Sequence, residues 1–274
     1  MSTLANEIVD RPPDLARPWT RTRIVGAVLV GFWALVILGL AWWLIAAWNP
    51  DLFDKYAPKY LSGLWVTIKL VTLSIVFGAA LSVPVAAARM SKNPLFAWPA
   101  YAYVYFFRGT PLLAQTFLVY YGLGEFSAEL DAVGLWSFFR DAWVCGLFAF
   151  TLNTAAYQAE ILKGAIESVP RGQWEAASAV GLSRTQTMWK IILPQALIVA
   201  LRPYGNEIIL MIKGSAIVAI ITVYDLMGET RRAYSRSFDF QTYIWAALIY
   251  LSIVEALRHI WDAFERRITR HLKR

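Results

Sequence analysis

The sequence is poor in the residues on which most enzyme and metal chemistry depends. Its 274 residues include two histidines, His259 and His271, and a single cysteine, Cys145. One cysteine excludes an intrachain disulfide and a cysteine metal cluster. The chain also lacks H-E-x-x-H, G-x-S-x-G and any cluster of carboxylates, so no catalytic constellation can be assembled. We therefore predict that this chain is not an enzyme and holds no metal.

Charge is scarce as well. Charged residues make up 16% of the chain and hydrophobic residues 58%, and the mean hydropathy is +0.47. A soluble domain of this size rarely shows such values. Backbone groups cannot stay unpaired in lipid, and no segment has the alternating pattern of a barrel strand. The sequence thus predicts an all-α integral membrane protein.

Six apolar runs are long enough to cross about 30 Å of hydrocarbon. They are Ile24 to Trp48, Gly63 to Ala88, Phe96 to Leu123, Ala142 to Leu162, Ala196 to Met227, and Tyr243 to Ile260. The first run follows a polar tail, residues 1–23, and lacks a small-residue cleavage pattern, so we interpret it as a retained span and not as a signal peptide. A basic tail, residues 264–274, follows the last run. We expect six transmembrane helices.

Six spans place both termini on one side of the membrane. That side then holds most of the 26 lysines and arginines, which by the positive-inside rule makes it the cytoplasmic side. The net charge of +7 is therefore a topology signal rather than a nucleic-acid surface. One outer loop, from Glu229 to Gln241, departs from the rule because it carries Arg231, Arg232 and Arg236.

The longest cytoplasmic segment, residues 163–195, has a helical pattern interrupted by proline and glycine, which predicts two short helices. Gly181 suits the left-handed residue that ends the first helix, and Ser183 with Gln186 has the spacing of a capping box that opens the second. Composition alone favours an amphipathic helix lying on the membrane over a helix that contacts a partner protein.

The same segment fills every position of a longer pattern: EAA, three residues, G, nine residues, I-x-L-P. The residues that fill it are Glu175, Ala176, Ala177, Gly181, Ile191, Leu193 and Pro194. This pattern resembles the EAA signature of ABC importer permeases. Gly172 and Gln173 extend the similarity towards the branch that carries polar amino acids, typified by histidine and glutamine permeases.

Further segments resemble that branch in the same order along the chain. They are Gly63 with Thr67, Arg108-Gly109-Thr110-Pro111, Ala156-Tyr157 with Glu160, Asn206-Glu207, and Lys213 with Ser215. The resemblance covers a permease domain of residues 61–263 and implies the five-helix core of type I ABC importers. The first span, residues 24–48, is additional to that core.

The resemblance also implies the partners. The chain contains no Gly-Lys pair and hence no P-loop, so ATP and magnesium would be bound by a separate ATPase, and this chain would hold no cofactor. We expect the nine residues named above, from Gly172 to Pro194, to couple that ATPase to transport. A second permease subunit, identical or similar, and an extracytoplasmic solute-binding protein complete the implied assembly in a bacterial inner membrane, with lipid around it and no nucleic acid.

Ionisable groups inside a membrane are costly and mark candidate pathway residues. Together with neighbouring polar residues, they give the candidate set Arg108, Tyr157, Asn206, Glu207, Lys213 and Ser215. Glu207 with Asn206 and either Lys213 or Arg108 would complement a zwitterionic amino acid; the other interpretation is mutual pairing that only stabilises the fold. Tyr157 and Glu160 suit a gate or a loop anchor better than a ligand contact.

We therefore expect the permease subunit of an ATP-driven importer of polar amino acids or related compounds. The alternative is a secondary transporter or channel for small polar solutes. We find no inverted repeat of the kind that such transporters show, and the EAA spacing would be unexplained in one. The sequence leaves open which amino acid or conjugate is carried.

Overall fold

A computed structural model describes residues 20–272 of the chain. These residues form two compact units that divide after Pro50, and each is described by itself. Every regular element in the described part is a helix, and no strand occurs there. The prediction of an all-α fold is confirmed.

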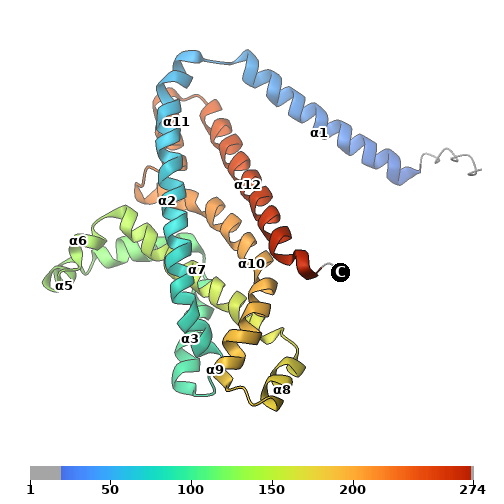
Figure 1. Cartoon of the computed structure of the whole chain (residues 1–274). Coiled ribbons are helices and arrows are strands. Elements are labelled where there is room, and N and C mark those ends of the chain that lie inside the picture. The colour runs from blue at the N-terminus through green and yellow to red at the C-terminus, as the bar shows by residue number, and fades with distance from the viewer. Residues whose placement is uncertain (1–19, 273–274) are drawn as a thin grey trace, which may run out of the picture. The chain divides into compact units, whose positions relative to one another are not determined.

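The first unit contains a single long helix, α1 (Arg21–Ala46) (Figure 1). Its N-cap, Thr20, accepts a hydrogen bond from the backbone N–H of Arg23 at 3.3 Å. No residue of α1 is buried within the protein. A helix that is apolar on all sides is suited to lipid.

The second unit begins with a helix of 40 residues and continues through shorter elements. They are α2 (Pro50–Arg89), α3 (Pro94–Gly109), α4 (Leu112–Phe117), η1 (Leu118–Gly122), α5 (Ser127–Ala132), α6 (Trp136–Phe139), α7 (Ala142–Glu167), α8 (Arg171–Ala179), α9 (Arg184–Thr187), η2 (Met188–Ile192), α10 (Leu193–Gly214), η3 (Ser215–Ile221), α11 (Leu226–Ser237), α12 (Gln241–Ile268) and η4 (Thr269–Leu272).

Among the described helices, four are long and apolar enough to cross a bilayer: Arg21–Ala46, Pro50–Arg89, Arg184–Ile221 and Gln241–Ile268. The other two predicted spans are helical but differ from an uninterrupted apolar run. The third is divided into α3, α4 and η1 because Thr110 is extended and Pro111 follows it, and proline lacks the N–H that would continue a helix. The fourth is α7, which contains several polar residues in its interior.

The predicted fifth span, to Met227, was too long. The helical path ends at Ile221, where Thr222 takes the left-handed conformation with a φ of 66°. The expected outer loop from Glu229 to Gln241 was also wrong for most of its length, because α11 occupies Leu226–Ser237. Helix α11 forms because Asp225 caps its first turn and because one face of the helix is buried.

Helix α7 is the centre of the second unit. It contributes thirteen buried residues, more than any other element of the described chain, and five of them are the alanines Ala149, Ala155, Ala156, Ala159 and Ala165. Small side chains let helix backbones approach closely within a membrane. Helix α7 packs against α3 and α10, and the second half of α7 shares a core cluster with Val104 of α3 and the first turns of α10.

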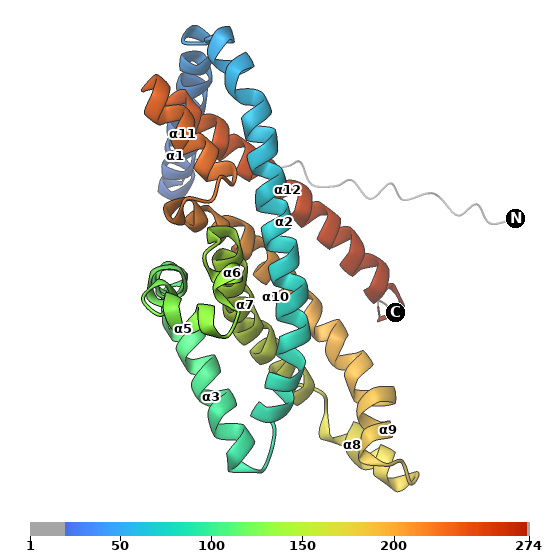
Figure 2. The same ribbon diagram turned by 90° about the vertical axis from the view of Figure 1, so that its left-hand side faces the viewer.

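The second unit has two distinct ends. In Figures 1 and 2, α8 and α9 lie at one end and α11 lies at the other. A helix of 40 residues is about 60 Å long, roughly twice the hydrocarbon thickness, so α2 extends beyond the bilayer. Near the α11 end, Leu52, Tyr56 and Tyr60 of α2 pack with Leu226 and Ala233 of α11. These residues form a small core in the projecting part.

We predict that the close approach of α2 and α11 tolerates no side chain at Gly63. A Cβ atom there would lie 2.7 Å from the backbone oxygen of Asp225, and overpacking of this kind typically costs about 1–3 kcal/mol. Gly63→Ala should therefore lower the melting temperature of the purified protein in detergent. Gly164→Ala is the matched control, because a Cβ at Gly164 meets nothing within 4 Å. Equal melting temperatures for the two variants would contradict the prediction.

Candidate functional site

The turn between α8 and α9 is held by the backbone at Gly181. The N–H of Gly181 donates to the carbonyl of Ser178 at 3.0 Å, and the N–H of Leu182 donates to that of Ala177 at 3.1 Å. This is the pattern of a Schellman motif. Gly181 has a φ of +77°, which confirms the prediction of a left-handed residue at this position.

Helix α9 opens with the predicted capping box. The hydroxyl of Ser183 accepts from the N–H of Gln186 at 3.3 Å, and the side-chain oxygen of Gln186 accepts from the N–H of Ser183 at 3.0 Å. The Schellman motif and the capping box meet at Leu182, so the turn between the two short helices is held by backbone hydrogen bonds on one side and by hydrogen bonds between side chain and backbone on the other.

Helix α8 presents a small polar face to its surroundings. Glu175 and Ala176 are exposed, whereas Ala177 is buried. Trp174, which is half-buried, packs against the same core cluster as Ile191 and Leu193 do. An exposed helix face of one carboxylate and small side chains allows another backbone to approach closely.

The rest of the predicted coupling loop is tied to α10. The side chain of Gln195 donates to that of Gln173 at 3.3 Å and to the carbonyl of Ile191 at 2.8 Å. Pro194 lies in the first turn of α10, directly after the π-helical segment η2. Gly172 lies within α8. The nine predicted coupling residues therefore all belong to one end of the second unit.

A charged cluster lies where α2, α3 and α7 meet. Glu160 of α7 forms salt bridges with Arg89 of α2 at 3.1 Å and with Arg108 of α3 at 3.4 Å. The three side chains line a hollow of about 360 Å³ together with Tyr101 and Tyr105. One carboxylate faces two guanidinium groups, so the hollow has a net positive charge.

Arg108 is placed by a broken helix. Its guanidinium lies 5.3 Å from the ring centre of Tyr157, and α3 ends one residue later. The side chain of Gln115 donates to the carbonyls of Phe107 and Thr110 at 2.9 and 3.1 Å, which satisfies acceptors that the broken helix exposes. The break is therefore a hydrogen-bonded feature that holds Arg108 at a helix end.

Glu207 is buried in the packed interface of α10 and α7, within electrostatic range of Arg108. It is 5% exposed, and the hydroxyl of Thr154 donates to its carboxylate at 2.9 Å. The amide of Gln158 donates in turn to Thr154 at 3.1 Å and to the carbonyl of Ile75 on α2 at 3.2 Å. This chain of polar groups connects three helices.

The structure does not bring the six predicted pathway residues into a single group. Arg108 and Tyr157 lie together, whereas Asn206 lines a separate hollow of about 300 Å³ between α10 and α12. Lys213 is exposed on α10. Ser215 is fully buried, and its hydroxyl donates to the carbonyl of Ile212 at 2.7 Å.

Sequence reasoning missed two members of the charged cluster. Arg89 was assigned only to topology, and Glu160 was assigned to a gate or anchor and not to an ion pair with Arg108. A signal for the pairing exists, because an intramembrane arginine needs a partner and Glu160 is an acidic residue of the neighbouring predicted span. Among the described residues, no group of three or more His, Cys, Asp or Glu side chains is placed to hold a metal.

Another missed residue, Asp225, lies in the linker between η3 and α11. It is fully buried, and its carboxylate accepts from the N–H of Gly228 at 2.8 Å and, over longer distances, from the hydroxyls of Thr67 and Tyr250. Burial raises the pKa of Asp225 to about 6, although these hydrogen bonds oppose the rise. Asp225 therefore joins α2, α11 and α12.

Comparison with known sequences gives consistent matches. Residues 75–270 match the protein family described as "Binding-protein-dependent transport system inner membrane component". The nopaline transport system permease protein NocM of Agrobacterium fabrum is 41% identical over 217 residues, which are 79% of this chain and 90% of that protein. The arginine ABC transporter permease protein ArtM of Escherichia coli K12 is 34% identical over 78% of this chain and 96% of its own length.

Solved structures agree in fold. The chain resembles one in the crystal structure of an amino acid ABC transporter with histidines, with a TM-score of 0.73 and 34% identity, over 81% of this chain and 99% of that one. An inward-facing structure of the MetNI methionine ABC transporter matches with a TM-score of 0.64 over 77% of this chain and 96% of that one. Its identity of 20% makes it evidence of fold alone.

We predict a pH dependence that comes from Asp225. Its pKa is about 6 in the folded protein, against an ordinary value of 3.8, so the folded state binds more protons than the unfolded state between these values. The contribution of Asp225 to the free energy of unfolding should therefore fall by roughly 2–3 kcal/mol as the pH rises from about 4 to about 6.

Thermal melting of the native protein and of Asp225→Asn between pH 4.5 and 7 measures this effect. The amide keeps an acceptor for the Gly228 N–H but does not titrate. The native protein should lose melting temperature relative to Asp225→Asn as the pH rises. Parallel curves would show that Asp225 does not titrate in this range.

Proposed function

This chain belongs to the family of binding-protein-dependent transport system inner membrane components, and on that premise we propose that it carries amino acids or amino-acid conjugates through its own helices. The family resemblance predicted from the EAA pattern is confirmed. The chain is a multi-pass inner membrane protein and the permease subunit of an ABC importer, and ATP hydrolysis resides on a separate subunit. The alternative of a secondary transporter or channel gains no support.

The observation that carries the proposal is the rigid turn of α8 and α9, which presents Glu175 on an exposed face. We propose that this face contacts the ATP-binding subunit, so that α8 is the coupling helix. Because hydrogen bonds hold the turn between α8 and α9, a movement of the ATP-binding subunit against Glu175 would displace α8 as a rigid body. The end of the molecule that bears α8 is then cytoplasmic, both termini lie in the cytoplasm, and α11 faces outward.

We further propose that Arg108 and Tyr157 contact the substrate. Every amino acid carries a carboxylate, and the hollow beside Glu160 has a net positive charge and aromatic walls. Guanidinium binds carboxylate in a two-pronged geometry that lysine cannot match. A substrate carboxylate can replace one of the two salt bridges of Glu160 without leaving an uncompensated charge.

The other predicted pathway residues enter the proposal in different ways. Asn206 and Lys213 are exposed on α10 and are proposed to face the passing substrate or the second permease subunit. Glu207 and Ser215 are buried and are proposed to act indirectly, by fixing the helices that carry the others. The relatives are named for nopaline and arginine transport, which supports amino acids and their conjugates as the substrate class.

We also propose the remaining members of the assembly. A single chain leaves many large apolar side chains exposed, for example Trp65, Val76 and Leu251, and such surface suits lipid or a second permease subunit. A solute-binding protein on the outer side would deliver the substrate. ATP and magnesium would be held by the ATP-binding subunit alone.

We predict that Glu175→Arg uncouples ATP hydrolysis from transport. Reversing the charge of one residue in a complementary interface disfavours docking of the partner. A loss of 1.4 kcal/mol of binding free energy already lowers the affinity about tenfold. ATP-dependent uptake into vesicles that contain the reconstituted complex should fall at least about tenfold, while insertion into the membrane is retained. Glu167→Arg, at the same end but before α8, is the matched control. Unchanged uptake with Glu175→Arg would refute the coupling role.

We predict that Arg108→Lys raises the substrate concentration for half-maximal uptake by about tenfold. The lysine ammonium is a point charge and cannot replace the planar guanidinium, which binds a carboxylate through two parallel hydrogen bonds. Arg202→Lys is the control, since Arg202 pairs with Glu265 and its side chain is 83% exposed. Equal half-maximal concentrations for native protein and Arg108→Lys would remove Arg108 from the substrate site.

Glu207→Gln should lower the melting temperature of the protein and leave the substrate concentration for half-maximal uptake unchanged.

A further inference from the structure

Helix α11 has an unusual charge for its position. Its twelve residues include Arg231, Arg232 and Arg236, against the single acidic residue Glu229. It lies at the end of the second unit opposite α8 (Figures 1 and 2), which is the outer end under the proposed function. Lysine and arginine are normally scarce there, so three arginines on one short outer helix need an explanation.

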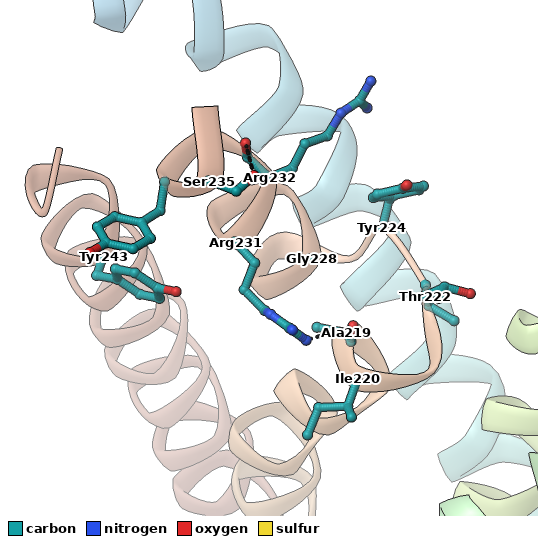
Figure 3. A pocket seen from close by; sticks show the side chains of 11 residues that line it. Ala219, Ile220, Thr222, Tyr224, Gly228, Arg231, Arg232, Ser235 and Tyr243 are labelled. Atoms are coloured by element: carbon teal, nitrogen blue, oxygen red, sulfur yellow. Dashed lines mark hydrogen bonds between the residues drawn. The ribbon is translucent and has the colours of Figure 1, made fainter. Parts of the chain in front are cut away.

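A hollow of about 450 Å³ opens beside these arginines. Tyr224, Tyr234 and Tyr243 line it together with Arg231 and Arg232. In Figure 3, Arg231 extends from α11 towards Ala219, with Tyr243 to one side and Tyr224 to the other. The lining therefore combines two guanidinium groups with aromatic rings that bear hydroxyl groups.

The guanidinium of Arg231 is exposed and incompletely bonded. A guanidinium carries five N–H donors, and within residues 20–272 Arg231 makes one hydrogen bond, from Nη1 to the carbonyl of Ala219 at 3.0 Å. The charge of Arg232 is partly balanced, because its guanidinium lies 3.5 Å from the carboxylate of Glu229. The same guanidinium lies 5.2 Å from the ring centre of Tyr224. Arg231 therefore supplies the net charge of the hollow.

The rim of the hollow has the composition of a protein interface. Tyr224 on the rim is exposed, as are Phe238 and Phe240 beyond the end of α11. Arginine and aromatic side chains are enriched in the parts of interfaces that contribute most binding energy. The small core that α11 forms with the projecting start of α2 places this rim beyond the bilayer rather than at its lipid face.

We propose that this hollow receives a carboxylate side chain of the extracytoplasmic solute-binding protein. The inference rests on the proposed function, which supplies the outer orientation and the partner. A positively charged hollow with unused guanidinium donors is complementary to an acidic side chain. The docked carboxylate accepts from Arg231 and is steered towards the hollow by Arg232.

Docking at this position has a consequence for the permease itself. The carbonyl that Arg231 holds belongs to Ala219 of η3, the 3₁₀ segment that starts at Ser215, two residues after Lys213. A carboxylate bound through the remaining donors would share the guanidinium with that carbonyl. Arrival of the binding protein would therefore be felt at η3 through Arg231, close to the residues proposed to face the substrate.

The test uses the complete transporter in nanodiscs, together with the solute-binding protein that stimulates its ATP hydrolysis. The double variant Arg231→Gln, Arg232→Gln should raise the binding-protein concentration for half-maximal stimulation by about tenfold at low salt. It should also flatten the salt dependence of that concentration. Arg236→Gln is the matched control, since Arg236 lies on the same helix but does not line the hollow.

Several outcomes would overturn the inference. One is a native half-maximal concentration in the double variant, and another is an equal rise with Arg236→Gln, which would indicate only net charge. A rise that occurs with anionic lipid but not in phosphatidylcholine nanodiscs would assign the hollow to lipid headgroups instead. If the double variant fails to fold, Arg231→Lys replaces it, because lysine keeps the charge but has fewer N–H donors. Arg231→Lys should give a smaller rise in the half-maximal binding-protein concentration, and an unchanged concentration would overturn the inference. A native complex that no binding protein stimulates would contradict the proposed function itself.

Discussion

The structure depends on one constraint: inside lipid, every backbone N–H and carbonyl must find a partner within the protein. Unbroken helices meet this requirement automatically, so the informative places are those where the helical path stops. At Thr110 the side chain of Gln115 replaces the missing donors, and Asn153 of α7 donates to that glutamine at 2.9 Å. At the other break, Asp225 caps α11 and holds α2 and α12 beside it. Each break carries a cost in hydrogen bonds that buried polar side chains offset, and each lies next to a candidate functional residue.

Apolar patterning was sufficient to predict an all-α membrane protein, and local turn chemistry was sufficient to predict the ends of α8 and α9. Gly181 and the Ser183–Gln186 capping box act through the backbone within a few residues, so the sequence alone contains the necessary information. The end of the fifth span was misjudged because residues up to Met227 remain apolar after the helix stops. Their hydropathy reflects packing against α2 and α12, which a window of sequence cannot distinguish from lipid contact.

The candidate site was harder to predict because its residues meet through tertiary packing. Arg89, Arg108 and Glu160 come from three different helices, and no spacing rule relates them. Glu207 shows the opposite problem: a carboxylate in a predicted span suggested a pathway, yet its hydrogen-bond donor is Thr154 in a packed interface. An ionisable residue in a predicted span therefore indicates that a partner exists, and only the fold decides whether that partner is another side chain or a ligand.

Helix α7 joins the two functional regions. Thr154, Tyr157 and Glu160 project from it towards α10 and α3, and its last residue lies four positions before the start of α8. Its buried alanines let α7 pack closely against α10. If α8 is the coupling helix, as proposed above, its displacement reaches Glu160 through α7, whereas Arg108 stands at the end of α3, where the break is held by separate hydrogen bonds. The salt bridges of Glu160 would then link the displaced helix to α2 and α3, which is why we propose them as the place where a substrate carboxylate biases the equilibrium.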